Sequence, residues 1–269
     1  MLACACLAFA QSSRVPREQF EVASLKPNKS AGNVTKLLFR GGGRFSATNA
    51  SLKNLIGYAY KAQYFAISGG PAWIDDDRYD IEAEAEDSSA THAQIEAMLQ
   101  SLLADRFHLI VHRETRQVPV YAIVPAKKGK KPASSGEGKC VAPDPKAPFP
   151  PAPVPGEPVP VPCGRLYSWG PVISGGRVTM PQLAESIANV MGRPVIDKTG
   201  FTGKFDVHLE FNLVGTAYRP VNPDAPTDTS RPTIFTALED QLGLKLESQK
   251  GPAEILVVDH AEKPAGDQG

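Results

Sequence analysis

Residues 42–60, GGRFSATNASLKNLIGYAY, decide the fold, because a close counterpart returns at residues 175–191 as GGRVTMPQLAESIANVM. Each stretch opens on two glycines, continues as a short run typical of a strand, and ends in apolar residues at three- and four-residue spacing. In the first copy Leu52, Leu55 and Ile56 carry this spacing, which predicts an amphipathic helix. A segment that returns with the same order of turn, strand and helix predicts a duplicated structural unit.

The segments that follow return in the same order. Each copy has a strand that opens on an aromatic residue and Asp, a second helix that runs into a strand, and a last apolar strand. The first copy reads DRYDIEAEA (77–85), IEAMLQSLLADRFHLIVHR (95–113) and VPVYAIVPAK (118–127), and the second reads GKFDVHLEF (203–211), IFTALEDQLGLKLES (234–248) and AEILVVDHAEK (253–263). We predict an α+β protein of two related small modules, each with two helices packed on a three- to four-stranded sheet.

Between the two copies lies a stretch dominated by proline. Residues 132–171 hold 12 of the 25 prolines of the chain, and their centre reads PKAPFPPAPVPGEPVPVP. Proline lacks a backbone N–H and fixes φ, so we expect an extended, polyproline-like connector. The sequence therefore predicts a first module at residues 20–131, a proline-rich linker at 132–171 and a second module at 172–264.

The first ten residues, MLACACLAFA, have the composition of a targeting segment. They are almost entirely apolar, and Ala8-Phe9-Ala10 has the small-x-small pattern that precedes signal-peptidase cleavage. We expect residues 1–10 to be a signal-peptide remnant and the mature chain to be soluble, periplasmic or secreted. A buried N-terminal segment and a lipoprotein anchored through Cys4 or Cys6 are the alternatives. No later stretch has the roughly 18 consecutive apolar residues of a membrane span, so we expect no transmembrane segment in the mature chain.

Two cysteines remain after the presumed signal segment. Cys140 and Cys163 flank the proline-rich centre, and an oxidising compartment would join them in a disulfide. The closed loop would stabilise the fold by about 3 kcal/mol in the chain-entropy description. Free thiols are the alternative, and two isolated cysteines without a nearby histidine make a poor zinc site.

Formal charge is balanced, with 29 Lys and Arg residues against 29 Asp and Glu residues. A chain without net charge has no general attraction for nucleic acid or for an anionic membrane, so we expect neither as a partner. The lysine-rich run at residues 127–131 is expected to be a solvated linker edge, with a weak anion contact as the alternative.

Residues 197–200, Asp-Lys-Thr-Gly, spell the phosphorylation loop of a P-type ATPase, in which the Asp attacks ATP. Such an enzyme also needs a nucleotide site and a Mg²⁺ site, and the sequence contains no Walker-type GxxxxGK[ST] motif. Gly200 and Gly203 bracket a polar stretch between apolar Val195-Ile196 and the next alternating strand, which is typical of a turn. We predict that Asp197 accepts hydrogen bonds from nearby turn N–H groups.

Asp80 and Asp206 hold equivalent positions in the two copies, in Tyr-Asp-Ile and Phe-Asp-Val. A catalytic carboxylate pair would have to lie within about 10 Å, and these residues belong to different modules. We predict that each is an outward-facing strand residue paired with a neighbouring Arg or Lys.

The five histidines are the remaining candidates for metal binding. His108 and His112 have the spacing of a helical zinc site, but RFHLIVHR alternates like a strand, in which such residues lie roughly 13 Å apart. We therefore expect no metal site at this pair.

Two further patterns are expected to be turns. The pairs Gly42-Gly43 and Gly175-Gly176 each precede a short strand and lack a dinucleotide-binding continuation. Residues 75–77, three consecutive Asp, lack the spacing of an EF-hand; a solvated turn is expected, with a weak Ca²⁺ contact as the alternative.

Long motifs in both copies resemble one family. GGRFSATNASLKNLI, ISGGPAWIDDDRYDIEA, MLQSLLADRFHLIVHRET, GRPVIDKTGFTGKFDVHLEF and ALEDQLGLKLESQKGPAEILVVDH are similar to the acidobacterial soil-associated family of exported proteins, a DUF3738-type domain of unknown function. The resemblance covers about residues 20–264. It implies export but no activity. The second copy resembles more loosely the short N-terminal domain of secretins and TonB-dependent receptors, which binds other proteins in the periplasm.

Taken together, these patterns favour a binding role over catalysis. We expect a non-enzymatic exported module that binds a protein or cell-envelope partner through its sheet edges, with no catalytic, cofactor-binding or metal-binding residue. The alternatives are a hydrolase with a site between the modules, which requires polar residues clustered around one pocket, and a small-ligand protein with an apolar cavity there.

Overall fold

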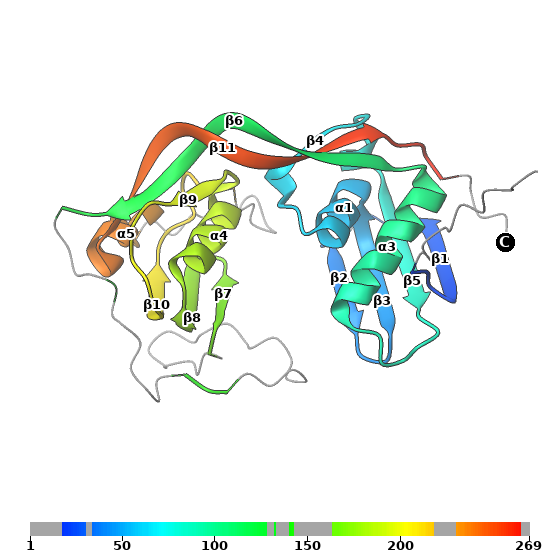
Figure 1. The fold of residues 1–269 in the computed structure, drawn as a ribbon, viewed down its shortest axis with the longest axis horizontal. Coiled ribbons are helices and arrows are strands. Elements are labelled where there is room, and N and C mark those ends of the chain that lie inside the picture. The colour runs from blue at the N-terminus through cyan, green and yellow to red at the C-terminus, as the bar shows by residue number, and fades with distance from the viewer. Residues whose placement is uncertain are drawn as a thin grey trace, which may run out of the picture. The chain divides into compact units, whose positions relative to one another are not determined.

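The computed structural model describes residues 18–30, 34–127, 132, 140–142, 163–217 and 230–264. These residues form a mixed α+β fold with five α-helices and three sheets, in which strands predominate (Figure 1). Their contacts group them into two compact units. The first unit takes its residues from 1–62, 69–111 and 258–269, and the second from 63–68 and 112–257.

A four-stranded antiparallel sheet forms the base of the first unit. It consists of β1 (Val22–Pro27), β2 (Lys36–Arg40), β3 (Arg44–Ser51) and β5 (Arg78–Glu84) in the order β1-β5-β3-β2. Along β5 the side chains of Tyr79, Ile81 and Ala83 are buried and the residues between them are not. This confirms the strand predicted at residues 77–85, because successive strand residues point to opposite faces.

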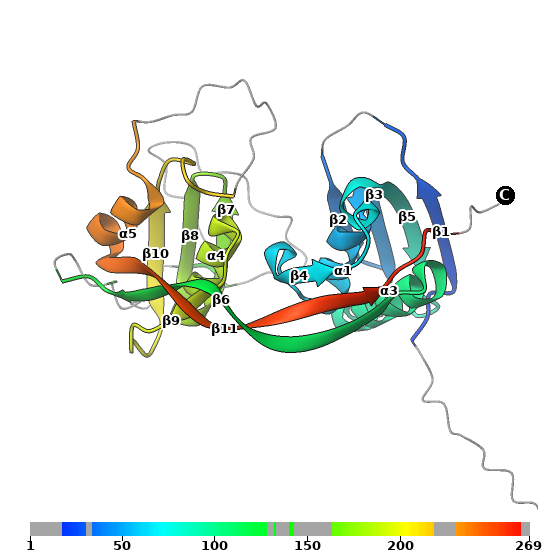
Figure 2. The ribbon, with the colours of Figure 1, turned by 90° about the horizontal axis from the view of Figure 1, so that it is seen from above.

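The helices of the first unit are α1 (Leu52–Tyr60), α2 (Trp73–Asp76) and α3 (His92–Phe107). Figures 1 and 2 show α1 and α3 on the same face of the sheet. Leu55, Ile56, Leu99 and Phe45 are fully buried and form the core between these helices and β3. Burying side chains of this size from water stabilises the unit by about 1.5–3 kcal/mol each.

The short helix α2 is an element that the sequence did not predict. The Asp-rich segment was expected to be a solvated turn, but Asp77 N donates to Trp73 O at 2.9 Å and closes one helical turn. The first unit therefore holds three helices where two were expected.

The second unit is built on a three-stranded antiparallel sheet. Its strands are β7 (Arg165–Trp169), β8 (Val172–Val178) and β10 (Phe205–Glu210) in the order β10-β8-β7, and its helices are α4 (Met180–Met191) and α5 (Ile234–Leu242). Ile187, Leu209, Phe211 and Leu238 are fully buried in one hydrophobic cluster. The helical spacing of apolar residues in α4 and α5 thus marks the faces that are buried.

A third sheet contains the two longest strands. Its members are β4 (Ile67–Gly69), which follows the short 3-10 helix η1 (Tyr64–Ala66), and β6 (Ile110–Pro125), β9 (Val195–Asp197) and β11 (Leu244–His260), in the order β4-β11-β6-β9. β6 and β9 are parallel, with Tyr121 opposite Val195. β6 begins in the first unit and continues in the second, and the last residues of β11 belong to the first unit.

Local sequence explains where the helices begin. α1, α3 and α4 each start with a capping box, in which the N-cap side chain and the side chain three residues later bond each other's backbone N–H; the pairs are Ser51–Asn54, Thr91–Gln94 and Thr179–Gln182. Such a cap stabilises a helix by about 1 kcal/mol. At the C-terminal end of α5, Gly243 is the C-cap with φ 62°, a left-handed conformation that favours glycine.

The glycine pair at 175–176 lies within a strand, which corrects the expected turn. Gly175 is in the middle of β8, opposite Leu166 of β7. A Cβ atom on Gly175 would lie 2.5 Å from Arg165 O and 2.8 Å from Leu166 Cδ2. Glycine is needed here because β7 approaches the backbone of β8 too closely for any side chain. The pair Gly42-Gly43 does form a turn, with φ of 83° and 71°.

A disulfide joins Cys140 and Cys163, the pair expected from the sequence. The proline-rich centre at 143–162 and the presumed signal segment at 1–10 lie outside the described residues. Among the helices that the structure describes, none has the length and apolar character needed to span a membrane.

Candidate functional site

The Asp-Lys-Thr-Gly segment forms a turn at the end of β9. Asp197 Oδ1 accepts hydrogen bonds from Thr199 N at 2.9 Å and Thr199 Oγ1 at 2.7 Å, and Thr199 Oγ1 accepts one from Phe201 N at 3.1 Å. Gly200 and Gly203, the two glycines from which the turn was predicted, both have positive φ. The Asp197 carboxylate is therefore an acceptor that organises this turn.

Asp80 and Asp206 hold the same structural position in the two units. Asp80 Oδ1 accepts hydrogen bonds from Asn49 N and Asn28 Nδ2, both at 2.8 Å. Asp206 Oδ1 accepts one from Arg177 N at 3.1 Å. Asn49 and Arg177 are left-handed, with φ of 53° and 54°, and each lies two residues before a helix N-cap.

This arrangement corrects the prediction that the two carboxylates pair with neighbouring Arg or Lys side chains. Each one accepts a backbone N–H at the point where a strand bends into a helix. A left-handed residue other than glycine costs roughly 1–2 kcal/mol, and the charge-assisted hydrogen bond offsets that cost. Asp80 and Asp206 are thus structural residues of the strand-to-helix bend.

Each of the five histidines lies near a glutamate. The nitrogen–oxygen distances are 3.2 Å for His92–Glu96, 3.9 Å for His108–Glu262, 3.9 Å for His112–Glu114, 3.1 Å for His208–Glu210 and 2.9 Å for His260–Glu262. Within the described residues no group of three or more His, Cys, Asp or Glu side chains is placed to hold a metal ion. Exposed pairs of this kind contribute little to stability.

His108 does not lie in the strand that the sequence predicted. α3 continues to Phe107, and His108 is its C-cap with φ 47°. β6 begins only at Ile110, so His108 and His112 belong to different elements. The alternation of apolar and polar residues in RFHLIVHR led to the wrong prediction. A helix that ends on apolar residues and runs directly into a strand gives the same alternation as one continuous strand.

A buried carboxylate lies between α1 and α3. Glu96 has a side-chain exposure of 8% and pairs with Lys61 Nζ at 2.8 Å and with His92 Nε2 at 3.2 Å. The neighbouring Tyr58 hydroxyl is buried and has no hydrogen-bond partner in the described part of the chain. Burial first, and the Glu96 charge second, raise the pKa of Tyr58 from 10.0 to about 12, so this hydroxyl stays protonated to a higher pH than that of an exposed tyrosine.

The Asp-rich segment at α2 is also held by ion pairs. Asp75 Oδ1 lies 3.3 Å from Lys53 Nζ, and Asp77 Oδ2 lies 2.6 Å from Lys263 Nζ. Lysine partners offset the negative charge that would attract a calcium ion. These carboxylates therefore join α2 to α1 and to the end of the chain.

The two edges of the sheet in the second unit differ. At the β10 edge, Glu210 N donates to Gln241 Oε1 at 2.9 Å, and Gln241 Nε2 donates to Glu210 O at 2.8 Å. The Gln241 side chain, which comes from α5, thus takes the place of a neighbouring strand. A side chain that occupies both backbone groups protects this edge from pairing with another chain.

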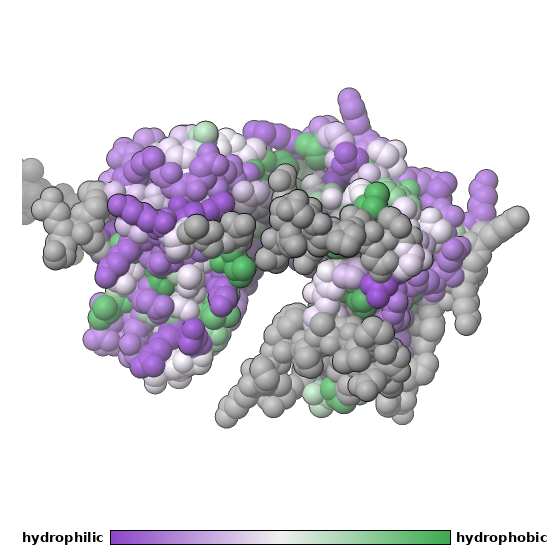
Figure 3. All heavy atoms as spheres, turned by 180° about the vertical axis from the view of Figure 1, so that it is seen from behind, coloured by the Kyte–Doolittle hydropathy of each residue, from purple (hydrophilic) through white to green (hydrophobic). Residues whose placement is uncertain are grey.

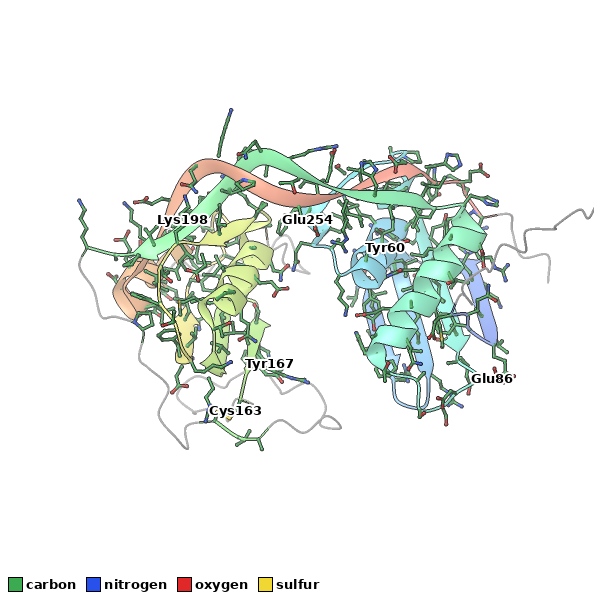
Figure 4. All side chains as sticks on the ribbon, viewed as in Figure 1. Tyr60, Glu86, Cys163, Tyr167, Lys198 and Glu254 are labelled. Atoms are coloured by element: carbon green, nitrogen blue, oxygen red, sulfur yellow. A yellow bond between two sulfur atoms is a disulfide. The ribbon has the colours of Figure 1, made fainter. Side chains whose placement is uncertain are left out.

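At the opposite edge, a groove of about 530 Å³ runs between β7 and α4. From β7 it is lined by Arg165, Leu166, Tyr167 and Ser168, and from α4 by Gln182, Glu185, Ser186 and Asn189, which share one helix face. Figure 4 labels Tyr167 on β7 and, just before this strand, Cys163. The groove therefore follows the outermost strand of the described sheet along its length.

The walls of the groove are fixed by local contacts. Gln182 Nε2 donates to Gly164 O at 2.9 Å and ties the start of β7 to α4. The Tyr167 and Trp169 rings stack with centroids 5.5 Å apart. Arg165 and Glu185 carry opposite charges, so the groove is electrically balanced and its other polar side chains are neutral. Such a surface recognises a ligand by hydrogen bonds and shape.

Sequence reasoning identified neither the groove nor Gln241. The available signal was the polar face of α4, spaced as Gln182, Ser186 and Asn189, but polar residues on one helix face usually meet solvent. On the face of the first unit shown in Figure 3, hydrophilic residues predominate and hydrophobic ones are scattered. Scattered exposed apolar residues are normal for a folded protein and do not mark a docking site.

The sequence pattern of one family, described as "Protein of unknown function (DUF3738)", matches residues 53–261. This match begins in α1 and ends just after β11, so it includes elements of both units. No curated protein and no solved structure matches the chain. Since the matched residues make up most of its length, the chain belongs to the DUF3738 family.

Proposed function

We propose that this protein is a non-enzymatic binding module that holds an extended segment of a partner protein along β7. The observation that carries the proposal is the contrast between the two edges of the second unit's sheet. The β10 edge is occupied by Gln241, whereas β7 lies beside a groove that α4 closes on one side. A peptide that adds to a sheet edge gains affinity from main-chain hydrogen bonds and specificity from alternate side chains.

The groove has the dimensions and chemistry for such a segment. Every second side chain of an added strand would point toward α4. There Gln182 is already bonded to Thr179 and Gly164, and Ser186 and Asn189 offer hydrogen-bond donors and acceptors. These three residues recur along the helix at the spacing of one face, parallel to the length of β7. The partner is therefore an extended polypeptide with small polar side chains at alternate positions.

Selection of peptides from a random displayed library on the folded chain tests this function. When a selected peptide binds, hydrogen exchange should show new protection of those β7 amides, within residues 165–169, that do not already bond β8. Ser186→Trp, which fills the groove, should weaken peptide binding by about tenfold or more, since a buried aromatic blocks the space. Glu239→Trp, at an exposed position on α5, is the matched control and should leave binding unchanged.

Two results would count against the proposal. One is selection of no peptide that binds the folded chain. The other is protection at a different element, with Ser186→Trp behaving like Glu239→Trp.

We further propose that the chain consists of two related modules, one within residues 20–131 and one that comprises residues 172–264 together with β7, which lies just before them in the stretch expected to be linker. The support is the order of elements. The first module has β2, β3, α1, β4, β5, α3 and β6, and the second repeats these types of element in the same order as β7, β8, α4, β9, β10, α5 and β11. Only β1, η1 and α2 of the first module have no counterpart among the described residues. Asp80 and Asp206 perform the same task at the same place in this order. Duplication of one unit accounts for both observations.

We propose export of the chain to the periplasm or the medium. The Cys140–Cys163 disulfide supports this location, because disulfides persist in oxidising compartments. Fusion of the chain to a reporter enzyme that is active only after its own disulfides form should give activity in intact cells. A fusion that lacks residues 1–10 should then be inactive, and equal activity of both fusions would contradict this proposal.

A further inference from the structure

A second cavity, of about 360 Å³, lies in the second unit among η1, α4, β9 and β11. All of its lining residues belong to that unit. Ten of the fourteen are apolar, so a molecule bound there would meet a mostly apolar wall. The volume lies within the range of about 300–1,000 Å³ that is typical of small-molecule sites.

Small side chains leave this space open. Ala184 and Ala188 lie one turn apart on α4 and are buried, and Ala253 of β11 is half-buried on another wall. Alanine has no atoms beyond Cβ, so a larger aliphatic residue at any of these positions would occupy the cavity. The walls also include Pro194 and Pro252, whose rings restrict backbone movement.

The charged lining residues are all acidic. Asp197 is already an acceptor in the turn after β9, and Glu254, labelled on β11 in Figure 4, pairs with Arg113. Glu185 differs from both. Its Oε1 accepts a hydrogen bond from the neutral Gln63 Nε2 at 3.3 Å, and it makes no ion pair within the part of the chain that the structure describes.

We propose that this cavity binds a small amphipathic organic cation. Its apolar part fills the space beside Ala184 and Ala188, and its ammonium group pairs with Glu185. An anion would be repelled by the acidic lining, and a neutral molecule would gain the apolar contacts alone. This site is distinct from the groove beside β7, although Glu185 lines both.

Three probes with one apolar body and different head groups test the charge preference. These are 4-phenylbutylamine, 4-phenylbutan-1-ol and 4-phenylbutyrate, titrated into the full chain by calorimetry at low salt, with amide chemical shifts recorded by NMR. The amine should bind about tenfold more tightly than the alcohol, as expected for one charge-assisted hydrogen bond. The carboxylate should bind most weakly, and the shifts should centre on η1, α4 and β11.

Substitutions distinguish the contribution of the Glu185 charge to binding from that of the cavity volume. Glu185→Gln should reduce the affinity for the amine to that for the alcohol and leave the alcohol unchanged. Ala188→Leu and Ala253→Leu, on different walls, should each weaken all three probes by about tenfold or more, because each fills the cavity. Ala253 does not line the β7 groove, so its variant leaves peptide binding along β7 intact. Thermal unfolding identifies any variant that fails to fold, and the second wall then provides the test.

A capped tripeptide, acetyl-Ala-Lys-Ala-amide, distinguishes a free amine from a lysine side chain of a polypeptide. Tighter binding of the tripeptide than of the amine would support a cation on a polypeptide, and the reverse would support a free small molecule. The proposal is overturned if the alcohol binds as tightly as the amine, if Glu185→Gln changes nothing, or if none of the cationic probes shifts amides around the cavity.

Discussion

Two aspartates show how single residues set the bends of this fold. Asp80 and Asp206 each accept the backbone N–H of a left-handed residue just before a helix begins. The strand register shifts at the same places, between Ala47 and Ala50 in one unit. A carboxylate at these positions therefore stabilises the bend that directs the chain from the sheet to the helix.

Removal of either carboxylate should destabilise the protein. Asp80→Ala leaves Asn49 N without its acceptor and removes a second bond to Asn28, so we expect a loss of about 2–3 kcal/mol. Asp206→Ala removes one bond and should cost about 1–2 kcal/mol. Urea unfolding measures both. Glu82→Ala, at an exposed position of β5, is the control, and equal losses for Asp80→Ala and Glu82→Ala would contradict the proposed role.

Tyr58 makes stability depend on pH in the alkaline range. Burial raises the pKa of Tyr58 from 10.0 to about 12, so the unfolded chain releases this proton before the folded chain does. Its contribution to stability is fully present below pH 10 and is lost as the pH rises from 10 to about 12. Tyr79 acts in the same direction, because burial and then Asp77 raise its pKa to about 12.

Tyr58→Phe should therefore reduce the loss of stability between pH 7 and pH 11. At pH 7 the variant should be as stable as the original chain or about 1 kcal/mol more stable, because it removes a buried hydroxyl without a partner among the described residues. Urea unfolding at the two pH values measures this difference. Tyr64→Phe, at an exposed tyrosine, is the control. A strong destabilisation at pH 7 would show that the hydroxyl is bonded.

At the scale of elements, the two edges of the sheet in the second unit differ in how the neighbouring helix contacts them. α5 is placed so that Gln241 occupies the backbone groups of Glu210, whereas α4 is placed beside β7 with a groove between them. An open edge can pair with another chain, so proteins usually protect it. We therefore place the partner along β7, beside the groove.

Gln241→Ala should open the β10 edge. The loss of two hydrogen bonds should lower the unfolding free energy by about 1–2 kcal/mol. The freed strand should also promote self-association, which light scattering can detect as concentration increases. Glu239→Ala on the same helix is the control. Unchanged stability and an unchanged monomer mass would mean that β10 is protected by other contacts.

At the scale of the whole molecule, the last strand of each half of the sequence, β6 or β11, contributes residues to the unit formed mainly by the other half. β6 follows α3 of the first unit, yet Ile123 near its end is buried in the hydrophobic cluster of the second. β11 follows α5 of the second unit, and beyond its end Glu262 N donates to Phe107 O in the first. Neither half of the sequence therefore contains all the residues of one compact unit.

Fragments that correspond to the two halves should depend on each other. Residues 18–131 and 164–264, produced separately, should each show little cooperative unfolding by circular dichroism, because each lacks strand residues that complete its core. When the fragments are mixed, they should associate and recover the transition. A fragment that contains residues 18–131 and folds stably alone would show that β6 completes its own half.

The sequence by itself determined the local features of this protein. Helical spacing and strand alternation depend on near neighbours, so the helices α1, α3, α4 and α5, the glycine turn after β9 and the α+β class could be predicted. The pairing of Cys140 with Cys163 was also predictable, since few cysteines remained. Family membership followed from long motifs.

Only the tertiary structure decided which distant residues meet. Whether β6 pairs within its own half, whether a side chain such as Gln241 covers an edge, and whether Asp80 bonds a lysine or the backbone of Asn49 depend on contacts between segments far apart in sequence. Strands with the same alternation can pair with several neighbours, and packing selects among them. The groove and the apolar cavity depend on which elements pack together, so the sequence of α4 alone could not reveal them.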